Sequence, residues 1–102
     1  MAESEKIKVK VDPDLKDLIP DFLQFRQDDI VATRGFLARG DFDSIKMLGH
    51  SMKGSGGGYG FYRITDIGAV IETAAKSKDV AAIERQVMEL EDYLSRVEIT
   101  YG

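Results

Sequence analysis

Apolar residues recur every three or four positions through most of the 102-residue chain, which is the spacing of amphipathic α-helices. The most regular stripe lies near the C-terminus and alternates steps of three and four without a gap: Val80, Ile83, Val87, Leu90, Leu94 and Val97. A pattern of this kind requires partner helices at a shallow crossing angle. We therefore predict a helix over residues 79–97, capped by Asp79, that packs lengthwise against other helices.

Three further stripes predict three more helices, over residues 20–39, 42–60 and 63–77. Gly40 supplies the C-terminal stop of the first of these helices, and Asp41 supplies the N-cap of the second. Connections of only a few residues favour antiparallel neighbours, so the predicted fold is a single all-α domain, an antiparallel up-down-up-down four-helix bundle. The inner stripes of the three helices are Phe22, Leu23, Ile30, Phe36 and Leu37; Phe42, Ile45, Leu48, Met52 and Ser55; and Ile64, Ile67, Ile71 and Ala74 or Ala75.

The chain ends differ from the bundle. Asp12 and Pro13 supply an N-cap and a first-turn proline for a short helix over 13–19. Residues 1–11 form an N-terminal tail or short strand, because their apolar residues alternate with lysines, and residues 97–101 alternate in the same way. Both termini lie at one end of an up-down bundle of four helices, so we expect them to pair as a small two-stranded β element. Two frayed tails are the alternative.

Composition narrows the classes of function. The chain has no cysteine, which excludes disulfides, thiolate metal sites and a cysteine nucleophile. The net charge of −4 comes from interleaved acids and bases, which argues against nucleic acid as the main ligand. The only basic cluster is the KIKVK of residues 6–10, which we interpret as a solvated extended segment rather than a phosphate-binding arm. No secretory signal and no apolar run of membrane-spanning length is visible, so we expect a soluble, cytoplasmic protein.

The only histidine, His50, lies in the segment LGHSMKGSGGGYGF, which holds six of the ten glycines. At about 100° per residue, His50 points away from the apolar stripe of its helix and into solvent. Residues three, four and seven positions away share its face, and these are Lys46, Lys53, Gly54 and Gly57. The segment therefore predicts an exposed imidazole beside two cations and a surface without side chains.

Several chemistries of this segment can be weighed from its residues. A metal site normally needs three or four ligands, including more than one histidine or cysteine, and this chain has one histidine and no cysteine. The glycines fit neither the G-x-x-x-x-G-K-[ST] nor the G-x-G-x-x-G phosphate loop, and Ser51 lies about 100° around the helix from His50, poorly placed for acyl transfer. A neutral imidazole is already a nucleophile, and phosphoryl transfer needs mainly positioning and charge neutralisation, which a partner can supply. Phosphorylation of His50 is the chemistry that remains.

The segment LGHSMKGSGGGYGF resembles the signature of the histidine-containing phosphotransfer (HPt) domains of bacterial phosphorelays and chemotaxis kinases. The pattern H-x-[LM]-K-G-S-[SA]-x-x-x-G is matched in register, and the stretch Ile64 to Glu72 fits the helix that follows. The sequence departs from the family at Gly56 to Gly58, where three glycines cost about 1 kcal/mol each in a helix interior. A break of the helix after Ser55 therefore stays open. The matching residues are His50, Met52, Lys53, Gly54, Ser55 and Gly60.

The resemblance implies a role for each matched position. His50 is the phosphoryl acceptor, at Nε2, and Lys53 is the nearby cation. The missing side chain of Gly54 admits a receiver domain, and Ser55 is a small packing position toward the neighbouring helix. The docking face expected around them consists of Lys46, Met47, Lys53, Gly54 and Gly57, with Gln27 and Arg34 added from the preceding helix by antiparallel geometry.

The resemblance also implies a phosphocarrier rather than an enzyme. Its partners would be a sensor histidine kinase and the receiver domain of a response regulator, which supplies the catalytic groups and Mg²⁺. We expect a bacterial monomer that binds no metal or cofactor itself. Two alternatives stay open: a non-phosphorylated adaptor that binds a receiver domain or another signalling partner, and a domain cut from a larger kinase.

Overall fold

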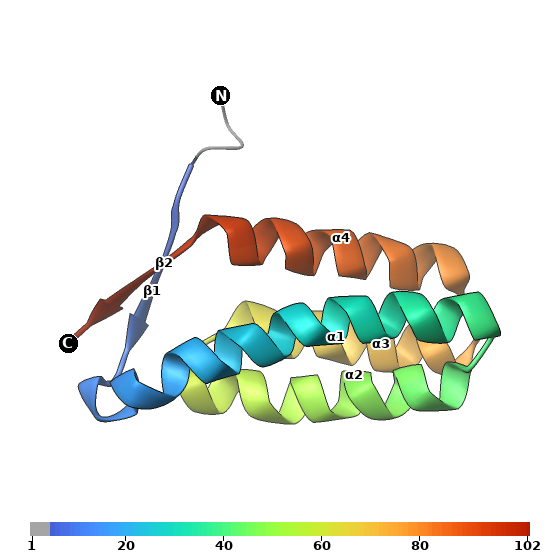
Figure 1. The fold of residues 1–102 in the computed structure, drawn as a ribbon, viewed down its shortest axis with the longest axis horizontal. Coiled ribbons are helices and arrows are strands. Elements are labelled where there is room, and N and C mark those ends of the chain that lie inside the picture. The colour runs from blue at the N-terminus through green and yellow to red at the C-terminus, as the bar shows by residue number, and fades with distance from the viewer. Residues whose placement is uncertain (1–4) are drawn as a thin grey trace.

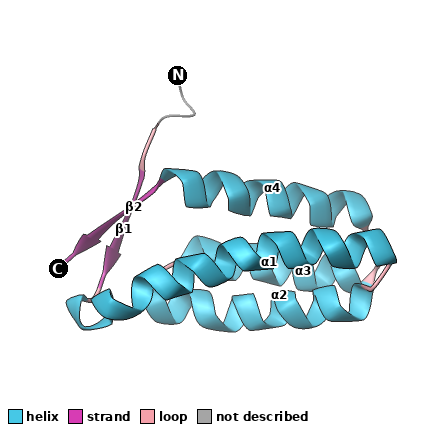
Figure 2. Ribbon diagram, in the orientation of Figure 1, coloured by secondary structure: helices cyan, strands magenta, loops and turns pink. Residues whose placement is uncertain are grey.

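Four α-helices make up most of the protein, whose computed structural model describes residues 5–102. Figure 1 shows the helices side by side along the longest axis, with the two strands crossing at one end, and Figure 2 shows how little of the chain is loop. Contacts join α1 to α2, α2 to α3, α3 to α4 and α4 back to α1. The elements in chain order are β1 (Ile7–Val11), the 3₁₀ helix η2 (Pro13–Leu18), α1 (Ile19–Arg39), α2 (Phe42–Gly56), the 3₁₀ turn η3 (Gly57–Tyr59), α3 (Tyr62–Lys76), α4 (Val80–Arg96) and β2 (Val97–Tyr101).

Local sequence accounts for where the helices begin and end. The Asp41 carboxylate accepts a hydrogen bond from the Ser44 N–H (3.1 Å), and Asp79 accepts one from the Ala82 N–H (3.1 Å), so both act as N-caps. Gly40 ends α1 in the left-handed conformation, with φ of 67°. The segment expected as a short helix over 13–19 is a 3₁₀ helix, after which α1 begins at Ile19 and holds Pro20 in its first turn, where a missing N–H costs nothing.

The second helix ends earlier than the continuous helix over 42–60 that its apolar stripe suggests. The Thr65 hydroxyl accepts a hydrogen bond from the Gly57 N–H (2.7 Å) and donates one to the Lys53 carbonyl (3.0 Å), the two groups that an α-helix would join directly. A side chain inserted in this way interrupts the helical ladder. The chain then makes one 3₁₀ turn, and Gly60 closes it with φ of 92°.

The α2–α3 pair is the most closely packed pair of helices, because glycines line its seam. A Cβ placed on Gly49 would lie 2.7 Å from the backbone nitrogen of Glu72, and one on Gly68 would lie 2.5 Å from that of Lys53. A Cβ on Gly56 would lie 2.7 Å from the backbone nitrogen of Thr65. Real side chains do not tolerate such distances, so this seam needs glycine at all three positions.

The chain ends form the two-stranded element that their alternation predicts. The strands β1 and β2 pair in parallel, with Ile7 opposite Val97 and Val11 opposite Tyr101. Val11 is buried, and the inward-facing apolar residues of both strands pack against the helical core. Within the described residues, no helix has the length and apolar character needed to cross a membrane.

Candidate functional site

The candidate site is centred on His50, whose side chain is 70% exposed on the outer surface of α2. Nδ1 of the ring lies 2.9 Å from Oε2 of Glu72 on α3. The ammonium of Lys53, one turn after His50, lies 2.8 Å from Oε1 of the same carboxylate, whose side chain is only 14% exposed. Glu72 therefore joins the histidine and the lysine through its two oxygens.

The carboxylate determines which ring nitrogen is free. The hydrogen bond from Lys53 lowers the pKa of Glu72 most, burial opposes this, and the hydrogen bond and charge of His50 lower the pKa further. Glu72 is therefore ionised at neutral pH and can only accept hydrogen bonds. Nδ1 of His50 therefore donates the hydrogen bond, and in the neutral ring the lone pair lies on Nε2, the nitrogen that does not contact Glu72.

The glycine seam explains why Glu72 reaches His50. His50 follows Gly49 directly, and Gly68 lies one turn before Glu72, so two of the positions where α2 and α3 leave no room for a Cβ flank the hydrogen bond. Neither the chemical role of Glu72 nor the structural role of Gly49 and Gly68 was predicted from the sequence. The only available signal was the position of Glu72 at the end of the segment that fits the HPt pattern.

The structure gives a different reason for glycine at each position after His50 where it explains one. A Cβ on Gly56 would overlap Thr65, so packing requires that glycine. Gly57 donates its N–H to Thr65 and has the Tyr62 ring 3.6 Å from where its Cβ would lie. A Cβ on Gly54 or on Gly58 would meet nothing within 4 Å. Packing within the described chain therefore leaves Gly54, which is exposed on α2, and Gly58, which is exposed in the turn η3 that follows, unexplained.

Ser55 points toward α1. Its hydroxyl accepts a hydrogen bond from Nη1 of Arg26 (3.0 Å), while Nε of Arg26 pairs with Asp29 at 2.7 Å. Burial raises the pKa of Asp29, and the charge of Arg26 partly offsets this effect. The Arg26 side chain is only 11% exposed, so this group fastens α1 to α2 rather than offering a cation to a partner.

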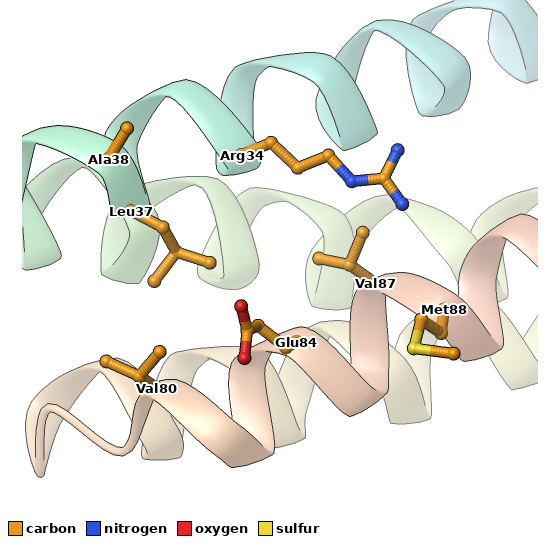
Figure 3. A pocket seen from close by; sticks show the side chains of 7 residues that line it. All are labelled: Arg34, Leu37, Ala38, Val80, Glu84, Val87 and Met88. Carbon is orange, nitrogen blue, oxygen red and sulfur yellow. The ribbon is translucent and has the colours of Figure 1, made fainter.

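Among the described residues, no hydrogen bond or ion pair joins Arg34 or Gln27, both expected in the docking face, to His50. Arg34 forms two hydrogen bonds with Glu91 of α4 and lies over the groove between α1 and α4 that Figure 3 shows. Gln27 precedes Arg34 by seven residues, so it lies on the same side of α1. Phe25 precedes Arg34 by nine residues and therefore lies about 180° around the helix, and its side chain is 57% exposed.

The other residues expected in the docking face lie on α2 with His50. Met47 is 71% exposed, while Lys46 and Lys53 are half-buried. Among the described residues, no group of three or more His, Cys, Asp or Glu side chains is placed to hold a metal ion.

A small helical domain that presents one oriented histidine on an open surface is the class of protein that this fold and site define. A family model described as the Hpt domain matches residues 17–100, and the chain therefore belongs to the Hpt domain family. Domains of this family carry phosphoryl groups on histidine in phosphorelays, and they are phosphocarriers rather than classical enzymes. Comparison with curated proteins and with solved structures gives no match.

Proposed function

We propose that the protein is a histidine phosphocarrier that accepts a phosphoryl group on Nε2 of His50 and exchanges it with the aspartate of a receiver domain. The observation that carries the proposal is the hydrogen bond from Nδ1 of His50 to Glu72. It keeps the lone pair on Nε2, where the ring is exposed to a partner. An adaptor that is never phosphorylated would not need an ionised carboxylate hydrogen-bonded to its histidine.

Phosphoryl transfer between a receiver domain and His50 needs no further reactant, because one bond to phosphorus forms as another breaks. The Nε2 lone pair attacks the phosphorus of the aspartyl phosphate, the P–N bond forms, and the P–O bond breaks as the receiver carboxylate leaves. The ring keeps its Nδ1 proton and becomes a phosphorylated imidazolium, whose positive charge faces the ionised Glu72 at 2.9 Å. The reverse step returns the phosphoryl group to a receiver aspartate. When a histidine kinase is the donor, Nε2 of His50 attacks the phosphoryl group that the kinase carries.

Lys53 has two functions in this proposal. Its ammonium holds Glu72 in the ionised state, and it offsets the charge of the phosphoryl group on the same face of α2. The Mg²⁺ and the remaining positive charge at the transferred group would be supplied by the receiver domain.

The proposed docking face consists of Met47, Gly54, Gly57 and Gly58 of the α2 region and Phe25 of α1. The open space above Gly54 and Gly58 allows a partner backbone to approach the histidine. Met47 and Phe25 are large, exposed and apolar, as the central residues of protein interfaces are. The proposed face thus combines exposed apolar side chains with glycine positions that leave space beside His50.

The test is transfer from a panel of phosphorylated receiver domains and active histidine kinases. We expect the wild-type protein to acquire an acid-labile phosphoryl group that His50→Gln does not acquire. Ser51→Ala, at the exposed neighbouring position, is the matched control and should be labelled like the wild type. A protein that binds receivers but is labelled by no donor would be an adaptor, and the phosphocarrier proposal would be wrong.

A further inference from the structure

A hollow of about 390 Å³ lies between β1 and the first turn of α3. This volume is within the range of small-molecule sites. Gly60 allows the two walls to approach, because a Cβ there would lie 3.2 Å from the Lys10 carbonyl. Its lining includes Lys8, Lys10, Gly60, Tyr62, Arg63 and Tyr93.

The α3 wall of this hollow is the N-terminus of a 15-residue helix without a cap. Its N-cap residue, Phe61, makes no side-chain hydrogen bond, and no acidic residue lies in the first turn. The backbone N–H groups of Tyr62 and Arg63 make no hydrogen bond with any residue that the structure describes. Free N–H groups and the helix dipole together favour a negatively charged group at this position.

A second, independent feature is the hydroxyl of Tyr93, a residue of α4 that is only 2% exposed. Buried tyrosines usually have a hydrogen-bond partner for the hydroxyl. The Tyr93 hydroxyl has none among residues 5–102, it is not sealed from solvent, and Tyr93 is one of the residues that line the hollow. Burial raises the pKa of Tyr93, and the positive charge of Arg63 partly offsets this effect.

The third feature is positive charge. Lys8 and Lys10 are exposed, and neither forms an ion pair with a described residue. Arg63 adds a guanidinium, which pairs with Glu89 at 2.9 Å. The sequence favoured a solvated segment for the KIKVK of residues 6–10, but in the fold Lys8 and Lys10 line the same hollow as Tyr62, Arg63 and Tyr93. Among the described residues, the lining of this hollow thus combines two unpaired lysines with free backbone N–H groups, all of which suit an anion.

We propose that this hollow binds the phosphate group of a small organic phosphate, of the size of a nucleoside monophosphate. The amides of Tyr62 and Arg63 and the ammonium groups of Lys8 and Lys10 surround the phosphate oxygens, and the Tyr93 hydroxyl donates a hydrogen bond to one of them. Tyr62, 70% exposed at the rim, offers a flat ring to the organic part of the ligand.

The test is an amide NMR titration of the full chain at low ionic strength with inorganic phosphate, ribose 5-phosphate and adenosine monophosphate as separate probes. We expect saturable shifts at the amides of Tyr62 and Arg63 with all three probes. Tighter binding of the monophosphate than of ribose 5-phosphate assigns the ring contact to Tyr62, whereas equal binding of the two overturns that contact. Shifts that do not saturate with any probe overturn the site.

Variants separate this site from general attraction to lysines. Tyr93→Phe keeps the buried ring and should weaken phosphate binding about threefold to tenfold. The double change Lys8→Gln and Lys10→Gln should weaken it by at least about tenfold, while Lys76→Gln, at the far end of α3, should leave it unchanged. Equal effects of the Lys76 and Lys8/Lys10 changes would show non-specific attraction, and unchanged binding by Tyr93→Phe would overturn the role of the hydroxyl. Thermal unfolding checks that each variant is folded.

The site stands apart from the phosphocarrier proposal. His50→Gln should bind all three probes like the wild type, because none of the residues that carry the site belongs to the His50 cluster. Loss of the shifts in His50→Gln would instead place the phosphate at the histidine and overturn the site. A failure to phosphorylate His50 would leave these titrations unaffected.

Discussion

His50 and Glu72 are joined across two helices by a hydrogen bond of 2.9 Å, from Nδ1 of the ring to Oε2 of the carboxylate. The relationship is directional, because the ionised carboxylate accepts and the ring must donate. It leaves one nitrogen, Nε2, as the nucleophile, and it places a negative charge where the phosphorylated ring becomes positive. The orientation of the histidine thus comes from α3 and not from its own helix.

Glu72→Gln should slow phosphoryl transfer to His50 by about tenfold to a hundredfold. This is the usual effect of losing a carboxylate that orients a histidine ring and stabilises positive charge on it. The amide can still accept a hydrogen bond, so Glu72→Ala should slow transfer more. Asp66→Asn, at an exposed position of the same helix, is the control. Nitrogen NMR of the ring should show the Nδ1–H tautomer in the wild type and a mixture in Glu72→Ala. An unchanged tautomer in that variant would contradict the role of Glu72.

The glycine seam should be sensitive to single methyl groups. Gly49→Ala and Gly68→Ala should each lower the free energy of unfolding by about 1–3 kcal/mol or more, because the new Cβ meets backbone atoms that cannot rotate away. Gly54→Ala adds a methyl group in open space within a helix and should raise stability by up to about 1 kcal/mol. Urea unfolding measures all three. Equal effects at Gly49 and Gly54 would show that the seam is not tight.

Gly54→Leu should separate folding from docking. The position is open, so the variant should fold with near wild-type stability. A leucine side chain beside His50 would hold a receiver domain away from the ring, and transfer should slow by at least about tenfold, since misplacement by about 1 Å is enough for a large loss of rate. Transfer kinetics with a saturating receiver domain give the measurement. Wild-type rates would contradict the need for close approach at Gly54.

The docking side of α1 can be tested with two residues on opposite faces of that helix. Phe25→Ser should raise the receiver concentration needed for half-maximal transfer by about tenfold, as expected for an apolar anchor. Arg34→Ala, whose side chain pairs with Glu91 of α4, should leave it unchanged. If Arg34→Ala had the larger effect, partners would dock on the α1–α4 side shown in Figure 3.

The Glu72 carboxyl should titrate below its ordinary pKa of 4.5. A carboxyl with a lowered pKa in the folded state contributes stability above its unfolded pKa and loses that contribution as the pH falls through the folded value. The stability difference between wild type and Glu72→Gln should therefore be present at pH 6 and shrink below about pH 4. Carbon NMR of the carboxyl measures the pKa, and Lys53→Met should raise it, because the Lys53 hydrogen bond is the largest cause of the shift.

Local signals made the helices predictable. Periodicity and the caps Asp41 and Asp79 placed the four helices, with most ends within a residue of those observed. The exposure of His50 followed from its helical phase alone. The end of α2 was harder to predict from the sequence, because it depends on the hydroxyl of Thr65, a residue of the following helix. A pattern within one segment cannot report a side chain that arrives from another.

Relationships between helices explain the rest of what the sequence left open. Antiparallel geometry gave the level of Arg34 along α1 but not the rotation of that helix, and the Glu91 pair shows that Arg34 turns toward α4. Glu72 looked like one more acid on an amphipathic helix. Its contact with His50 depends on how closely two backbones approach, which Gly49 and Gly68 decide together.

The parallel register of β1 and β2 joins residues from opposite ends of the sequence, with Ile7 opposite Val97. Such a pairing closes nearly the whole chain into one loop, so its entropic cost is met only after the helices have brought the ends together. The strands should therefore assemble last and open first, and their amides should exchange with solvent faster than those of α2 and α3. The hollow beside β1 exists only in molecules that have completed this final step, so a ligand bound there would favour the fully folded state over every partly folded one.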